Sequence, residues 1–280
     1  MLLRNVALVS ETQSISFSEL SRVSAALQKQ ALRDLGPIWN ITATCDAFGR
    51  LEDVPVGYWP IIIEDDIRTP GAAGIHEDKD GQPFALVTAG SGWSLTASHE
   101  LVEMLVDPFG RRLTAGQSTM PGQGRVEFLV EPCDPSEAVQ FAYLINGVTV
   151  SDFYTPLFFS TTHNPANRYS FTGAIKKPRQ VLKGGYLSWH DPVTDHWFQE
   201  TFFSGNKSKF RDLGRFTASG NKSFRRQIYD VTHEAFDAKR PQTKQQATAF
   251  AKALFASAES MDSKAEAWRE QIAAIKAAQV

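Results

Sequence analysis

The sequence of 280 residues contains little cysteine, no long apolar run and almost no net charge. Two cysteines, Cys45 and Cys133, are too few for a disulfide framework and are not spaced as a Cys-x-x-Cys metal pair, so we expect small buried residues. A formal charge of -2 provides no overall field that would recruit nucleic acid or an anionic membrane. No apolar run approaches the roughly 18 residues of a membrane span. The opening MLLRNVALVSETQ lacks the pattern of a signal peptide, and we expect a cytoplasmic protein.

Two common catalytic signatures are also missing. The chain contains no Gly-x-Ser-x-Gly elbow, which argues against a serine hydrolase of that type. It contains no Gly-Lys-Ser/Thr phosphate loop, which argues against a nucleotide-binding site of that type. A hydrophobic content of 42% is nevertheless enough for a sizeable core.

Hydrophobic periodicity predicts an α+β protein in which a mixed sheet packs against helices. The expected elements of the first part are strands at 5–11, 39–48 and 58–67, a helix at 16–36 closed by Gly36 and Pro37, a hairpin at 74–90 with its turn at Asp80 and Gly81, and a helix from Ser94 to Asp107. Ser94 or Thr96 is the expected N-cap of that last helix, and Pro108 the expected stop.

Composition divides the chain into four predicted regions. These are an α/β subdomain at 1–115, a mainly β region at 116–204, a basic connecting segment at 205–240 and an Ala-rich helical tail at 241–280. The segment GGYLSWHDPVTDHWFQE in the second region has the pattern of a hairpin around Asp191 and Pro192. The basic residues between 205 and 226 are expected to form a solvated loop, with a patch for an acidic partner or nucleic acid as the second interpretation.

The stretch SLTASHELVEMLVDPFG, residues 94–110, carries the strongest chemical signal. At about 100° per residue, a helix places one His and three acids on one stripe, opposite a stripe of leucine and valine: His99, Glu100, Glu103 and Asp107. A solvated stripe usually mixes charge signs, yet there is no Lys or Arg between Gly92 and Phe109. The helix dipole also disfavours an anion at its C-terminal residue, and a bound cation would compensate. The pattern therefore predicts a divalent metal, zinc by preference, held by His99 and Glu103.

This order of elements resembles the upper subdomain of the zincin metallopeptidases, where a twisted sheet lies above a helix with a His-Glu-x-x-His motif. His99 and Glu100 match that motif, and Glu103 stands in place of the second His. The resemblance implies that His99 and Glu103 bind the metal and that Glu100 is the general base. The chain also resembles an uncharacterised set of bacterial and phage proteins that share the Ser-His-Glu-x-x-Glu-x-Leu-x-Asp-Pro helix, a Gly-Val-x-Val-Ser-x-Phe segment and a Gly-Gly-Tyr segment. No activity follows from that second resemblance.

The third ligand stays open at this point. A catalytic zinc site takes three protein ligands. Asp107 shares the stripe but lies roughly 12 Å along the helix from His99, so it requires a sharp turn of the chain. The alternatives are Glu131 and Asp134 in VEPCDPSE, followed by His76 and His163.

Two functions from different classes remain. The first is a metal-dependent, peptidase-like hydrolase in which Glu100 activates water and the strand at 82–88, expected at the edge of the sheet, holds an extended peptide by strand addition. The second is a non-catalytic structural or assembly protein, for example a virion component, with a protein partner on the C-terminal helices. A closed, dry hydrogen-bond network in which His99 donates to Glu103 or Asp107, with no cavity above it, would favour the second function.

Overall fold

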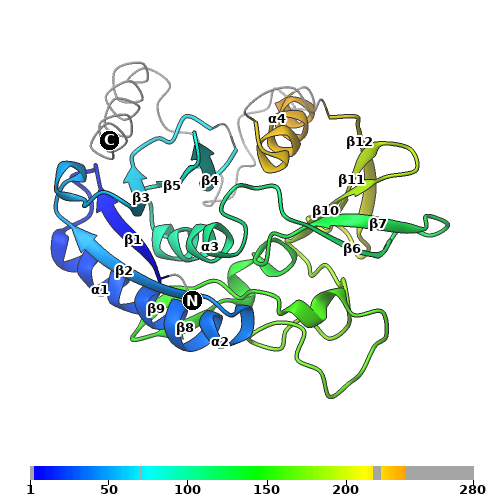
Figure 1. Ribbon diagram of the computed structural model, residues 1–280, viewed down its shortest axis with the longest axis horizontal. Coiled ribbons are helices and arrows are strands. Elements are labelled where there is room, and N and C mark those ends of the chain that lie inside the picture. Colours follow the sequence, from blue (N-terminus) through cyan, green and yellow to red (C-terminus); the bar gives the residue numbers. More distant parts are fainter. Residues whose placement is uncertain (1–2, 70, 217–221, 238–280) are drawn as a thin grey trace.

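The computed structural model describes residues 3–69, 71–216 and 222–237. In this part of the chain two five-stranded sheets stand on either side of a central helix, α3 (Trp93–Val106) (Figure 1). The α+β class predicted from periodicity is confirmed. No described helix is long and apolar enough to cross a membrane.

The first sheet follows the predicted strands of the N-terminal region. Its strands run in the order β2-β1-β3-β5-β4, and they are β1 (Leu3–Ser10), β2 (Thr42–Phe48), β3 (Tyr58–Glu64), β4 (Gly74–Lys79) and β5 (Gln82–Thr88). All pairs are parallel except β4 with β5. The strand at 82–88 was expected to be the edge of this sheet, which is wrong: β5 pairs with β3 as well as β4, so β4 is the edge.

Apolar residues lie on both faces of the first sheet, as expected for parallel strands covered on both sides. Ile61 and Ile63 of β3 pack toward α3, whereas Ile62 between them packs with Leu51 and Val54 on the opposite face. The turn between β4 and β5 confirms the predicted hairpin. Asp80 and Gly81 adopt φ of 51° and 88°, the left-handed pair that a two-residue turn requires.

The first helix runs further than the sequence suggests. α1 (Phe17–Lys29) begins at Ser16, whose hydroxyl accepts a hydrogen bond from the Glu19 amide, and continues through a π-helical turn (Gln30–Leu35) into α2 (Gly36–Trp39). The predicted stop at Gly36 and Pro37 is wrong. Proline at the start of a helical turn lacks only an amide that would be unpaired anyway, and the chain instead leaves the helix at Asn40, with φ of 56°.

The central helix α3 matches its predicted length. It ends at Asp107, before Pro108, as expected, but its N-cap is Gly92, and neither Ser94 nor Thr96 supplies a capping hydrogen bond. Its aliphatic residues Leu101, Val102 and Leu105 are fully buried in the main core. This packing fixes the rotation of α3, so that the opposite stripe faces the second half of the molecule.

The second sheet is antiparallel. Its order is β12-β11-β10-β7-β6, with β6 (Leu113–Gln117), β7 (Arg125–Leu129), β10 (Tyr186–Asp191), β11 (His196–Thr201) and β12 (Lys209–Gly214), and a small hairpin is formed by β8 (Tyr143–Ile145) and β9 (Val148–Val150). β10 and β11 are the hairpin predicted around Asp191 and Pro192. Short 3-10 turns lie at Leu51–Asp53, Asp134–Ser136, Val139–Phe141 and Pro156–Phe159.

One hydrophobic core joins the two halves. It includes Ile61 of the first sheet, Leu101 of α3 and Trp189 of the second sheet. The predicted division between residues 115 and 116 falls inside β6, and the helical tail predicted at 241–280 lies outside the described residues. Cys45 and Cys133 are free and buried, as expected, and burial raises the pKa of the Cys45 thiol to about 12.

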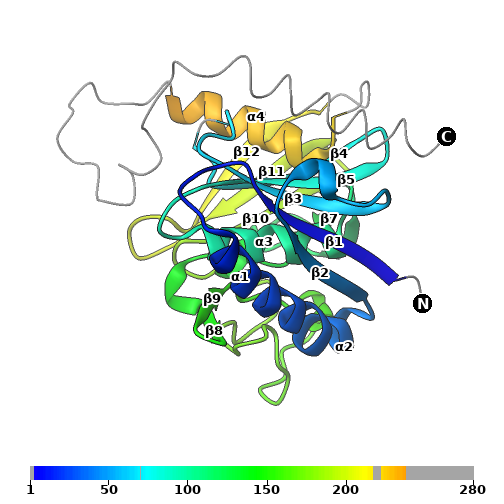
Figure 2. The same ribbon diagram turned by 90° about the vertical axis from the view of Figure 1, so that its left-hand side faces the viewer.

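The last described helix, α4 (Phe224–Asp237), lies between β4 of the first sheet and β12 of the second (Figures 1 and 2). Part of the segment predicted as a basic solvated loop therefore forms β12 and the start of α4. Arg226 of α4 contacts Glu77 of β4 at 2.9 Å. This helix covers the region where the polar stripe of α3 meets the second half of the molecule.

Candidate metal centre

The polar stripe of α3 is buried, not solvated. Glu100, Glu103 and Asp107 are each at most 2% exposed, and the His99 side chain is 12% exposed. The chain that follows β7 lies over the stripe from one side, and β4 lies over it from the other. We call His76, His99, Glu100, Glu103, Glu131, Asp134, Glu137 and Arg225 the buried acidic cluster.

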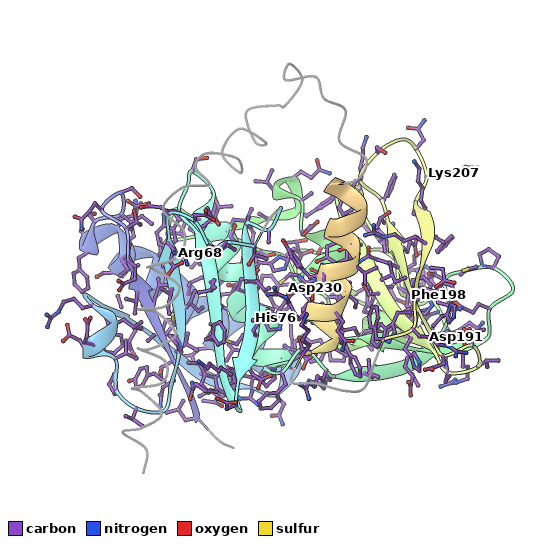
Figure 3. The ribbon with its side chains drawn as sticks, turned by 90° about the horizontal axis from the view of Figure 1, so that it is seen from above. Arg68, His76, Asp191, Phe198, Lys207 and Asp230 are labelled. Atoms are coloured by element: carbon purple, nitrogen blue, oxygen red, sulfur yellow. The ribbon has the colours of Figure 1, made fainter. Side chains whose placement is uncertain are left out.

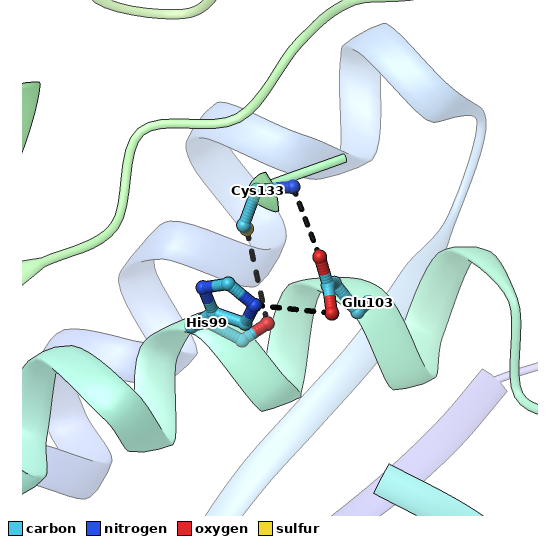
Figure 4. Close-up of side chains that lie close together, drawn as sticks. All are labelled: His99, Glu103 and Cys133. Carbon is cyan, nitrogen blue, oxygen red and sulfur yellow. Dashed lines mark hydrogen bonds and ion pairs between the residues drawn. The ribbon is translucent and has the colours of Figure 1, made fainter. Parts of the chain in front are cut away.

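One part of the cluster is built around His99. Its Nε2 lies 3.1 Å from Glu103 Oε2, one helical turn further along α3, and 3.4 Å from Asp134 Oδ1. The other oxygen of Glu103 accepts a hydrogen bond from the Cys133 amide at 3.2 Å (Figure 4). Glu137, half-buried in the same loop as Asp134, places a carboxylate oxygen within 4.8 Å of the His99 and Asp134 atoms.

The other part is built around His76 of β4. His76 is fully buried, and Figure 3 shows it on the side of the first sheet that faces α4. Its Nδ1 lies 3.4 Å from Glu100 Oε2 and 3.8 Å from Glu103 Oε2. Its Nε2 lies 3.1 Å from the backbone carbonyl oxygen of Asp107. Glu103 Oε2 is therefore common to both parts.

Arg225 of α4 supplies the cluster with a permanent positive charge. Its Nη1 lies 3.3 Å from Asp134 Oδ2 and donates to the Tyr186 hydroxyl at 2.6 Å. The second interpretation of the basic segment predicted an acidic partner on another molecule. For Arg225 the structure shows an acidic partner within the chain.

The hydrogen-bond network of the cluster is not closed. Several buried atoms have no hydrogen-bond partner among the described residues, namely His76 Nδ1, Glu100 Oε2, Glu103 Oε2, both carboxylate oxygens of Glu131, Asp134 Oδ1 and the Tyr154 hydroxyl. Unpaired buried polar atoms of this kind are rare in folded proteins, and each calls for an explanation such as a bound ion. Five carboxyl groups face one guanidinium and two imidazoles in the cluster.

The pKa values of the cluster reflect this excess of acid. Burial raises the pKa of Glu131 well above its ordinary value, and the Glu103 carboxylate raises it further. Burial and Asp134 raise the pKa of Glu137 to about 8. Burial also raises the pKa of Glu103, but His99 beside it lowers that pKa more, so that Glu103 ends below its usual range. Burial also raises the pKa of Asp134, so three carboxyl groups of the cluster are harder to ionise than in water.

The structure brings some of the predicted metal ligands together and places another apart from them. His99 and Glu103 lie together, and Asp134, one of the alternatives for the third position, joins them. Asp107 does not: its carboxylate accepts hydrogen bonds from backbone amides after the helix, including Arg112 at 2.7 Å. This also explains how an anion is tolerated at a helix C-terminus, because neighbouring amides stabilise it.

The other predicted residues are also placed. Glu131 has an oxygen within 4.8 Å of Glu103 and Asp134 oxygens, and His76 joins Glu100 and Glu103. His163 is exposed and stacks on Tyr169, outside the cluster. The Glu100 carboxylate, predicted to be the base, is directed at His76.

Two residues of the buried acidic cluster were not predicted from the sequence. Glu137 lies three residues after Asp134 in the segment VEPCDPSE, so the acid-rich composition of that segment was a signal for it. Arg225 lies 91 residues from Asp134, and no local pattern links the two.

Two carboxylate oxygens lie close enough to His99 Nε2 to share a metal ion with it. A tetrahedral zinc with bonds of about 2.0 to 2.2 Å separates its ligand atoms by roughly 3.4 Å. The two measured separations from His99 Nε2 are 3.1 and 3.4 Å. Glu103 is held by an amide of the loop and Asp134 by Arg225, which is the kind of support that orients metal ligands.

Surface hollows of the described part lie elsewhere. One is lined by Thr161, His163 and residues 176–180, and a smaller one by Glu77, Asp78, Lys222, Ser223 and Arg226, between β4 and α4. Neither is lined by His99 or Glu103. His99 and Glu137 are the partly exposed members of the cluster.

Comparison of the chain with protein-family models, with curated proteins and with solved structures finds no match. The function is therefore argued from the cluster itself.

Proposed function

We propose that the chain is a metal-dependent hydrolase of the peptidase type, related in design to the zincins. The observation that supports this most is the set of donors around His99, where Glu103 Oε2 and Asp134 Oδ1 lie at metal-ligand spacing from His99 Nε2 and, among the described residues, have no hydrogen-bond donor apart from the histidines of the cluster. A closed, dry network without a cavity above it would favour a purely structural stripe. The unpartnered atoms argue against a closed network, whereas neither surface hollow described above is lined by His99 or Glu103, which favours the structural reading. The mixed nitrogen and oxygen donors suit zinc, and a carboxylate-rich set also suits manganese or iron.

His99, Glu103 and Asp134 would hold the ion. A divalent ion in such a set supplies Lewis-acid polarisation and a water nucleophile at neutral pH. The ligands keep their positions because each has a second contact: Glu103 accepts from the Cys133 amide, and Asp134 contacts Arg225. Ligands fixed in this way need no reorganisation during a reaction.

A carboxylate beside the ion would act as the general base. The sequence assigns this role to Glu100, and the structure adds Glu137, whose oxygen lies close to His99 and Asp134. Glu137 is half-buried and belongs to the partly exposed side of the cluster, whereas Glu100 is 2% exposed and faces His76. Position alone therefore favours Glu137 as the group that reaches both solvent and a bound substrate.

An extended peptide remains the proposed substrate. Strand addition requires a sheet edge, and the edge near the cluster is β4. Since Arg226 of α4 contacts Glu77 of β4, α4 lies alongside part of this edge.

The alternative is a non-catalytic protein in which the ion only holds α3 to the loop after β7. The burial of Glu103 and Asp134 favours it, because these groups are each less than 3% exposed. Both the hydrolase and the structural protein would bind a metal ion, but only the hydrolase would cleave a substrate. Two measurements therefore distinguish them.

The first measurement is metal content. Protein purified without chelator is expected to carry a divalent ion, and His99→Ala is expected to lose at least one equivalent because the imidazole is its nitrogen ligand. His190→Ala, which removes a histidine paired with Glu127 on the second sheet, is the control and should match wild type. Negligible metal in both wild type and His99→Ala would refute the proposal.

The second measurement is hydrolysis of an unstructured peptide library followed by mass spectrometry. Removal of a general base typically lowers the rate by 10² to 10⁴-fold, and we expect Glu137→Gln to show such a loss with His99-bound metal and fold retained. Glu100→Gln is measured in parallel, because a loss there with all metal retained would assign the base to Glu100. Metal binding with no cleavage by wild type would leave the structural alternative.

A further inference from the structure

The strongest unexplained feature of the cluster is the ring orientation of His76. Its Nε2 lies 3.1 Å from the Asp107 carbonyl oxygen, which can only accept, so Nε2 carries the hydrogen. In the neutral ring Nδ1 then presents a lone pair. That lone pair faces the Glu100 and Glu103 carboxylate oxygens at 3.4 and 3.8 Å, and the side chain is fully buried. A lone pair among carboxylate oxygens is repulsive unless a cation lies between them.

A proton on Nδ1 satisfies this geometry poorly. Charge-assisted hydrogen bonds between nitrogen and carboxylate oxygen measure about 2.7 to 2.9 Å. The observed separations are longer, and both His76 Nδ1 and Glu100 Oε2 lack a hydrogen-bond partner among the described residues. Separations of this size do match the roughly 3.4 Å between two ligands of one ion with bonds of about 2.1 Å. A donated N–H from the other ring nitrogen to a backbone carbonyl is also the usual support of a metal-ligating histidine.

We infer that the cluster holds a second divalent cation, bound by His76 Nδ1, Glu100 and Glu103, so that Glu103 bridges two ions. The inference rests on the proposed function, since Glu103 also serves the ion at His99. In this arrangement Glu100 is a ligand of the second ion, which leaves Glu137 as the base.

The charge of the cluster agrees with two ions when all five carboxyl groups are ionised, because they then exceed the single charge of Arg225 by four and two divalent ions supply four positive charges. Without an ion, burial raises the pKa of Glu131 and Glu137, and the carboxylates around His76 and His99 raise the pKa of both imidazoles despite their burial. Glu103 Oε2 lies within 4 Å of a nitrogen on each histidine, so one carboxylate oxygen is within reach of both proposed ions. Glu131, with two unpartnered oxygens near Glu103 and Asp134, is available as a further ligand.

The chemistry assigned by this site is hydrolysis with two ions, one on each side of the bridging carboxylate. Two-ion sites act on phosphate esters and on peptide ends. The hydrolysis assay therefore also includes a simple phosphodiester as a second substrate, in addition to the peptide library.

The test is metal stoichiometry after dialysis against Mn²⁺, measured by plasma mass spectrometry and electron paramagnetic resonance. Wild type is expected to bind two equivalents with the spectrum of two coupled ions. His76→Ala and Glu100→Gln are each expected to bind one, with the spectrum of a single ion, and His190→Ala two. Glu100→Gln preserves side-chain volume, so it keeps the test valid if His76→Ala does not fold.

The outcomes separate the two proposals. One equivalent in wild type that is lost in His99→Ala but retained in His76→Ala and Glu100→Gln overturns the second cation and leaves the proposed function intact. No bound metal in wild type overturns both. Two equivalents in Glu100→Gln overturn its assignment as a ligand.

Discussion

Replacement of Glu103 by Gln is expected to abolish metal binding and with it the stabilisation that metal provides. Glu103 Oε2 is shared by the His99 and His76 sides, so a neutral amide there removes an anionic ligand from both. Gln keeps an oxygen for the Cys133 amide that Glu103 Oε1 now accepts, so the loop after β7 retains its contact with α3. The affinity for Mn²⁺ is expected to fall by more than roughly 10²-fold, beyond the 10 to 100-fold typical of changes to supporting residues.

Thermal unfolding with and without chelator measures this effect. A ligand present at 100 times its Kd stabilises a protein by about 2.7 kcal/mol, which for a chain of this size corresponds to roughly 5 to 10 °C in Tm. Wild type is expected to lose that stability on chelation, and Glu103→Gln to be unaffected by it. Glu127→Gln, a carboxylate on the surface of β7, is the matched control and should respond as wild type does. Equal sensitivity of wild type and Glu103→Gln to chelator would contradict a metal at Glu103.

Replacement of Arg225 by Ala is expected to destabilise the protein by about 3 to 5 kcal/mol, because it leaves the Asp134 carboxylate buried without its guanidinium. Asp134 is 3% exposed and Arg225 only 12%. The loss of the hydrogen bond from Arg225 to the Tyr186 hydroxyl adds to the effect. Urea unfolding gives the change in free energy.

The neighbouring residue of α4 is a close control. Arg226 contacts Glu77 and Asp230 but is 35% exposed, so Arg226→Ala is expected to cost less than about 1 kcal/mol. Asp134→Asn provides a second check, since the penalty of Arg225→Ala should shrink when the carboxylate is neutral. A similar loss of unfolding free energy in Arg225→Ala and Arg226→Ala would show that the buried Arg225–Asp134 contact contributes no more stability than the exposed contacts of Arg226.

The local elements of the fold were largely predictable. The helix of α3 followed from apolar residues at helical spacing and from Pro108 after it, and the hairpin of β4 and β5 followed from Asp80 and Gly81. Predictions failed where one residue is compatible with two local structures. Pro37 is typical of the end of a helix, but here it lies in the first turn of α2, where proline is tolerated. The edge strand was misassigned because strand order within a sheet is set by pairing between distant segments, and nearby residues do not reveal it.

The sequence by itself determined that His99 and Glu103 share one face of a helix, because an i,i+4 spacing brings two side chains together in any α-helix. Only the tertiary structure decided what else meets them. His76 belongs to the antiparallel edge strand β4, and Asp134 and Glu137 belong to the loop after β7. Arg225 belongs to α4, a helix from a distant part of the chain. Tertiary packing also turned a stripe that reads as a solvated face into a buried one. The physical reason is range: helical periodicity acts over a few residues, whereas burial and charge pairing depend on which distant surfaces the core brings into contact.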